Sequence, residues 1–100
     1  MHIKDFLVID NQKNHGFKSF SNKYVLLKNF NLASDWEFLK KFENIETLRV
    51  EDSYIDAEKF YKVLLKLKKV KNLTYNHYCY FTLIKNRNLF DFRMDNLSRY

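Results

Sequence analysis

The sequence predicts an α/β domain built from repeated strand–helix units. Two segments with the same spacing of apolar side chains start 25 residues apart, and an amphipathic stretch with helical periodicity lies between them. Self-similarity at a period of about 20 to 29 residues is typical of architectures in which each unit contributes one strand and one helix. The 100-residue length suits one core, so we expect residues 1–100 to form a single domain.

The repeated segments predict up to five strands. The two central copies consist of Ile45, Leu48, Val50, Ser53 and Ile55, and of Val70, Leu73, Tyr75, Tyr78 and Tyr80. Looser copies on both sides give strand starts at Phe6, Val25, Leu48, Leu73 and Phe92. The intervals between these starts are 19, 23, 25 and 19 residues, so the central pair carries the fold prediction.

The first helix is predicted to begin at Ser34. Ser34 and Glu37 have the spacing of a capping box, in which each side chain accepts a hydrogen bond from the other residue's backbone N–H. Trp36, Leu39 and Phe42 then recur at helical spacing, and we expect them to face the core.

The second helix is predicted over residues 56–71. Asp56 is suited to the N-cap position, and Glu58 lies in the first turn. The apolar stripe of this helix is Phe60, Val63, Leu64, Leu67 and Val70. The opposite face carries Lys59, Lys62, Lys66 and Lys69 at three- and four-residue spacing.

An alternative fold closes both ends of the chain with β-hairpins. Residues 78–84 and 89–94 are rich in β-forming side chains, and residues 85–88 are a plausible turn between them. Residues 6–9 and 24–28 could likewise pair antiparallel. The result would be a compact α+β domain.

The central residues resemble leucine-rich repeat proteins over about residues 34–80. The residues that carry the resemblance are Phe38, Phe42, Ile45, Leu48, Val50, Ser53 and Ile55, followed by Leu64, Leu67, Val70, Leu73 and Tyr75. The resemblance implies a short solenoid with parallel strands on a concave face, helices on the convex face, and binding of protein ligands.

The chain departs from this family at the ninth position of each unit, where members usually place Asn or Cys. The corresponding residues here are Asn11, Phe30, Ser53, Tyr78 and Leu97, so we expect no continuous polar ladder between the turns. The chain also has no obvious capping segments. Exposed edge strands would then allow a homodimer to form.

The outward positions of the expected sheet are the candidate protein-binding site. They include Tyr24, Leu26, Lys28, Thr47, Arg49, Glu51, Thr74, Asn76 and Arg93. Leu7 and Ile9 are expected on the same face, where with Tyr24 and Leu26 they would add exposed apolar surface. The alternative is that the N-terminal segment folds over these four residues and buries them. Over all five strands this face holds six acids and three bases, which favours a polar or basic epitope on a partner protein.

The lysine-rich helix is the alternative site. The chain has a formal charge of +6 and a pI of about 9.4, and the excess of positive charge lies outside the expected sheet face. Lys59, Lys62, Lys66 and Lys69 could therefore lie along a nucleic-acid backbone. Such a stripe is more often the solvated face of an amphipathic helix.

No catalytic or cofactor-binding pattern stands out, and the chain is expected not to be an enzyme. His77 and Cys79 would share one face of a strand, but nothing nearby supplies an orienting third group. Cys79 is the only cysteine, and the histidines lack metal-ligand spacing, so neither a metal nor a cofactor is expected.

The remaining composition bears on location and role. We find no transmembrane stretch and no secretory signal pattern, so a cytoplasmic protein without a membrane partner is expected. The abundance of Lys, Asn, Phe, Ile and Tyr is typical of an A/T-rich genome. Together these features suggest a small inhibitor or immunity protein of bacterial or phage type that binds a protein target.

Overall fold

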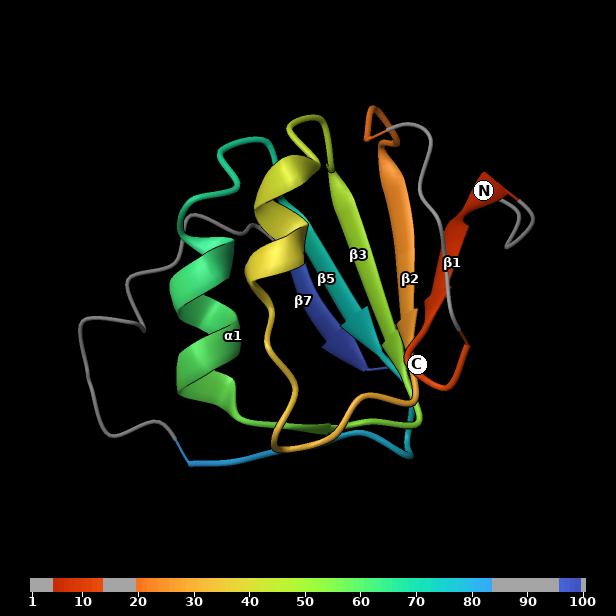
Figure 1. Cartoon of the computed structure of the whole chain (residues 1–100), viewed down its shortest axis with the longest axis vertical. Coiled ribbons are helices and arrows are strands. Elements are labelled where there is room, and N and C mark those ends of the chain that lie inside the picture. The colour runs from red at the N-terminus through yellow and green to blue at the C-terminus, as the bar shows by residue number, and fades with distance from the viewer. Residues whose placement is uncertain (1–4, 14–19, 84–95, 100) are drawn as a thin grey trace.

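Five parallel strands form the main sheet of the computed structural model, which describes residues 5–13, 20–83 and 96–99. They are β1 (Leu7–Asp10), β2 (Tyr24–Lys28), β3 (Thr47–Glu51), β5 (Asn72–Tyr75) and β7 (Asn96–Arg99), and they are neighbours in this order (Figure 1). A second sheet pairs β4 (Tyr54–Ile55) with β6 (Tyr80–Phe81), also in parallel. The predicted α/β class with a parallel sheet is therefore confirmed.

The central register agrees with the sequence pattern. Leu48 lies opposite Leu73, as the 25-residue offset predicted, and Val25 lies opposite Leu48. β1 and β2 also pair in parallel, so the antiparallel pairing of residues 6–9 with 24–28 is wrong. The alternative C-terminal hairpin falls largely on residues 84–95, outside the described residues.

Both outer strands differ from the predicted register. Leu7, not Phe6, lies opposite Val25, so the first strand is shifted by one residue. At the other end Leu97, not Phe92, lies opposite Leu73. Phe92 itself lies outside the described residues.

The first helical segment is a 3-10 helix, η2 (Glu37–Lys41), and it does not have the predicted capping box. The Ser34 hydroxyl oxygen instead accepts a hydrogen bond from the Asn31 N–H (3.0 Å), within the preceding turn. Asp35 Oδ1 accepts the Glu37 N–H at 2.9 Å. The side chain before the helix start therefore takes the role that was predicted for Ser34.

The second helix, α1 (Ala57–Leu64), begins as predicted and ends early. Asp56 Oδ1 accepts the Lys59 N–H at 3.3 Å, which confirms the N-cap. At the other end the Leu67 N–H donates to the Leu64 carbonyl at 3.0 Å, a three-residue spacing that tightens the last turn. Lys66 and Lys69 therefore lie beyond the helix.

The core lies between the main sheet and the two helices, which are on the same side of it (Figure 1). Every residue of the two predicted apolar stripes is buried in this core. Trp36 packs between Phe30 and Phe60, with ring centroids 4.7 and 4.8 Å away. Burial of these large rings supplies much of the apolar surface that stabilises a chain of this length.

Candidate functional site

The other side of the main sheet carries the predicted protein-binding residues, and we call it the open face. It consists of Tyr24, Leu26, Lys28, Thr47, Arg49, Glu51, Asn72, Thr74 and Asn76. Along β3 the alternation is clear, because Leu48 and Val50 are buried in the core while Arg49 is half-buried. In the described part of the chain neither helix lies over this face (Figure 1). The predicted residue Arg93 lies outside the described residues.

The apolar part of the open face differs from the prediction. Leu26 is only 3% exposed, so it is not the exposed aliphatic contact that the sequence suggested. Leu7 packs against the core and Ile9 belongs to it, because of the one-residue shift of β1. Val8, which the sequence analysis missed, lies opposite Leu26 and is 40% exposed.

The polar side chains of the open face contact one another across the strands. Arg49 Nε lies 3.5 Å from Glu51 Oε2 on the same strand. The Asn72 side-chain amide donates to Thr47 Oγ1 at 3.3 Å on the neighbouring strand. These contacts hold the polar side chains of this face in a fixed arrangement.

Two acid–amide pairs form a rim along the carboxyl ends of the strands, and we call Asp10, Asn29, Asp52 and Asn76 the rim. The Asn29 amide donates to Asp10 Oδ1 at 3.0 Å, and this bond, with one from the Gln12 N–H, holds the pKa of Asp10 below its usual value. The Asn76 amide donates to Asp52 Oδ1 at 3.1 Å. Asn29 and Asp52 have positive φ angles of 61° and 53°, a conformation that Asn and Asp tolerate better than most residues.

Behind the rim, two small side chains connect successive turns. Ser53 is fully buried, and its Oγ accepts the Phe30 N–H at 3.1 Å and donates to the Glu51 carbonyl at 2.8 Å. Tyr54 pairs with Tyr80, so Cys79 and not Tyr78 corresponds to Ser53. The assignment of Tyr78 to this position was therefore wrong by one residue.

The thiol of Cys79 is partly buried and lies beside two hydrogen-bond acceptors. Its Sγ lies 3.2 Å from the Val50 carbonyl oxygen and 3.3 Å from Asn76 Oδ1, both of which can accept the S–H. Partial burial raises the pKa of the thiol, which disfavours the nucleophilic thiolate at neutral pH. His77, the other half of the weak catalytic pattern, is exposed.

Exposed tyrosines adjoin the rim, although two of them, Tyr78 and Tyr80, occupy positions of the repeated apolar pattern. The rings of Tyr54 and Tyr80 stack with centroids 5.2 Å apart, and both side chains are more than half exposed. Tyr78 is 69% exposed, and its N–H donates to Asn76 of the rim at 3.2 Å. The 25-residue offset aligns Tyr80 with Ile55 and not with Tyr54, so the sequence repeat gave no signal for this pair.

The four predicted lysines are exposed but do not form one continuous stripe. Lys59 and Lys62 line a hollow of about 270 Å³ beside Trp36. Lys66 and Lys69 line a different hollow of about 360 Å³, together with Lys40, Glu43, Leu67 and Lys68. The early end of α1 separates the two pairs.

Comparisons with known proteins assign no family to this chain. No protein-family model matches the sequence, and neither curated proteins nor solved structures give a significant match. Among the described residues, no three His, Cys, Asp or Glu side chains are grouped so that they could hold a metal ion. None of the helices in the described ranges has the length and apolar character needed to cross a bilayer.

Proposed function

We propose that this chain is a short leucine-rich-repeat-like solenoid that binds another protein through the open face and its rim. The observation that carries the proposal is the one-sided arrangement of the fold. All-parallel sheets usually have helices on both faces. Here both described helices lie on one side, and the other side presents polar, charged and aromatic side chains in register.

The chemistry of this surface suits a polar, basic epitope. The open face and rim carry the carboxylates of Asp10, Glu51 and Asp52 against the bases Lys28 and Arg49, although the whole chain has a charge of +6. Three acids against two bases give this surface a net charge of −1 in a chain of +6, so a basic partner would be repelled less on this side than elsewhere on the molecule.

The exposed tyrosines supply the large contact area that such an interface needs. Tyr54, Tyr78 and Tyr80 lie next to the rim, and tyrosine is enriched among the residues that dominate binding energy at protein interfaces. The small size and the abundance of Lys, Asn, Phe, Ile and Tyr favour a protein-binding inhibitor or immunity protein of bacterial or phage type.

The test is capture of a partner by the tagged protein from a lysate of the source organism, washed at low and at high salt, with a nuclease-treated control. We expect one protein to be retained at high salt regardless of nuclease. Arg49→Glu combined with Glu51→Lys should abolish this retention. The exchanged pair still carries opposite charges on the same strand, so the domain should stay folded. Retention of the partner by this variant would contradict the proposal.

A second candidate function is nucleic-acid binding, and the lysine-lined hollow favours it. Lys40, Lys66, Lys68 and Lys69 surround this hollow with Glu43 as the one acid. Phosphate binding through such lysines weakens steeply with salt because counterions are released. Replacement of Lys59, Lys62, Lys66 and Lys69 by Glu should then abolish binding, whereas the Arg49/Glu51 exchange should not.

A further inference from the structure

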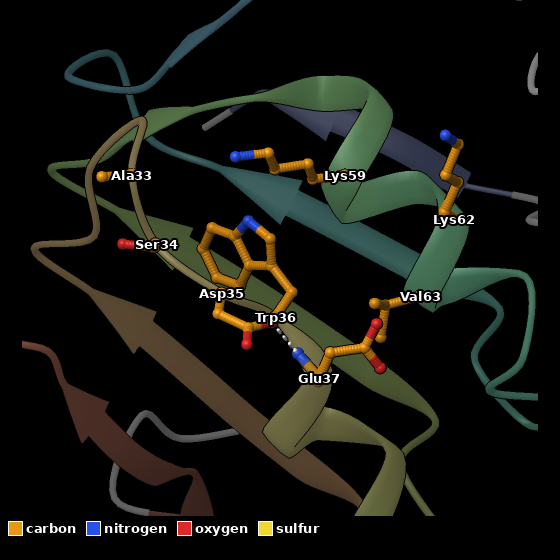
Figure 2. A pocket seen from close by; sticks show the side chains of 8 residues that line it. All are labelled: Ala33, Ser34, Asp35, Trp36, Glu37, Lys59, Lys62 and Val63. Atoms are coloured by element: carbon orange, nitrogen blue, oxygen red, sulfur yellow. Dashed lines mark hydrogen bonds between the residues drawn. The ribbon is translucent and has the colours of Figure 1, made fainter.

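A hollow on the helix side of the molecule has the features of a small-ligand site. It lies between the segment that precedes η2 and the outer face of α1, and its volume is about 270 Å³ (Figure 2). Its lining consists of Ala33, Ser34, Asp35, Trp36, Glu37, Lys59, Lys62 and Val63. The open face is on the opposite side of the sheet, so this site is separate from the proposed protein interface.

The indole N–H of Trp36 has no hydrogen-bond acceptor among the described residues. Trp36 is 1% exposed, and its Nε1 is buried. Figure 2 shows this nitrogen on the edge of the ring that faces Lys59. The edge-to-face contact with Phe60 (4.8 Å) is at best a weak substitute for a hydrogen bond. A buried donor without a partner is costly, and an acceptor in the hollow would relieve that cost.

Two ammonium groups, those of Lys59 and Lys62, border the same hollow. Lys59 and Lys62 are three residues apart on α1 and so lie on one face of the helix. Among the described residues, neither takes part in an ion pair. Both are exposed, so the charges are available to a ligand.

Both carboxylates that line the hollow have partners of their own. Asp35 Oδ1 accepts the Glu37 N–H at 2.9 Å, as the dashed line in Figure 2 marks. The Glu37 carboxylate pairs with Lys40, outside the hollow. Each of the two carboxylates therefore has a partner other than Lys59, Lys62 and the Trp36 N–H.

We propose that this hollow binds a small oxyanion ligand, a molecule that carries a phosphate or carboxylate group. Lys59 and Lys62 supply the charge, and the Trp36 N–H supplies a directional hydrogen bond. The Trp36 ring and Val63 form an apolar wall for the rest of the ligand. A hollow of about 270 Å³ has room for a small molecule and not for a nucleic-acid strand.

The test uses the intrinsic fluorescence of Trp36, the only tryptophan in the chain, as a reporter at the site. The protein is titrated with inorganic pyrophosphate in one arm and with citrate in the other, at constant ionic strength. We expect a saturable change with at least one probe, and the arm that responds identifies the oxyanion as a phosphate or a carboxylate. No saturable change in either arm would overturn the proposal.

Two double variants separate a specific site from general attraction to a basic protein. Lys59→Gln with Lys62→Gln should weaken binding by about tenfold or more, since two charge-assisted contacts are lost. Lys66→Gln with Lys69→Gln removes the same charge from the other hollow and should leave the affinity unchanged. Equal weakening in both variants would overturn the proposal.

The indole N–H is tested separately by Trp36→Phe, with binding measured by calorimetry and folding checked by circular dichroism. We expect the affinity to fall several-fold in the folded variant. An unchanged affinity would overturn the role of the N–H. If Trp36→Phe does not fold, the two lysine variants still decide whether the site exists.

Discussion

Ser53 shows how one buried hydroxyl connects neighbouring turns of the chain. It accepts the Phe30 N–H and donates to the Glu51 carbonyl, and it is fully shielded from water. Ser53→Ala should lower the free energy of unfolding by about 1–3 kcal/mol, because the Phe30 N–H loses its partner. Urea denaturation measures this change. Ser34→Ala removes an acceptor in an exposed turn and should cost much less, and an equal loss would contradict the account.

Cys79 occupies the place of Ser53 in the next turn. The rate at which its thiol is alkylated should depend on how far the thiol is buried. The folded protein should react with iodoacetamide more slowly at neutral pH than the urea-unfolded chain, since the raised pKa lowers the thiolate fraction. The same shift favours the folded state while the thiol is protonated. Its contribution should be present below the usual pKa of 9.0 and lost as the pH rises above it. Equal alkylation rates in both states would contradict this assignment.

Two predictions, the register of β1 and the counterpart of Ser53, were each wrong by one residue. Residues 6–9 are four consecutive apolar residues, so no alternation indicated which of them face the core, and a slip of one residue exchanges the two faces. One additional residue in the turn between β5 and β6 moved the position of Ser53 from Tyr78 to Cys79. A constant repeat offset cannot anticipate such an insertion.

At the scale of elements, α1 depends on its N-cap. Asp56→Ala should lower the free energy of unfolding by about 0.5–2 kcal/mol, because the Lys59 N–H loses its acceptor. Asp56→Asn keeps an acceptor of the same length and should cost little. Thermal or urea denaturation compares the two variants. An equal loss for both would indicate that charge, not capping, stabilises the start of the helix.

The pairing of β3 with β5 rests on two leucines in register. Leu48→Ala and Leu73→Ala should each lower the free energy of unfolding by about 2–5 kcal/mol, since both side chains are fully buried in the core. Leu83→Ala is the control, because this side chain is 81% exposed. A neutral result for either core variant would show that the repeat register is wrong.

The sequence predicted where the helices lie and which face of each is buried, but not how they begin and end. The apolar spacing identified the buried face of each segment correctly, because burial follows from periodicity. The capping-box spacing failed at Ser34, whose hydroxyl oxygen accepts from Asn31 in the preceding turn. The lysine-rich stretch after Leu64 continues the helical pattern in sequence, but three-residue hydrogen bonds end the helix there.

At the scale of the molecule, the sequence identified the open face on β2, β3 and β5 but not its apolar composition. Leu26 is buried, and it lies opposite Val8 and Arg49 on the strands that precede and follow its own. The alternation along β2 therefore does not show how much of the Leu26 side chain is exposed, because that depends on the neighbouring strands. The exposed tyrosines were missed for the same reason, since β4 and β6 are only two residues long.

The edges of the main sheet are β1 and β7. A homodimer through these edges remains a prediction of the sequence, and sedimentation at several protein concentrations tests it. We expect the monomer–dimer equilibrium to shift with concentration but not with the Arg49/Glu51 exchange, because those residues lie on β3, in the middle of the sheet. Loss of the dimer in that variant would place the contact on the open face instead.

The central claim is that the open face is the surface that contacts a protein partner. A photoreactive amino acid placed at Thr74, in the middle of the open face, tests it most directly when compared with the same amino acid at Lys62 on α1. We expect illumination in the lysate to link one protein covalently to the Thr74 variant and none to the Lys62 variant. Crosslinking at Lys62 but not at Thr74 would contradict it.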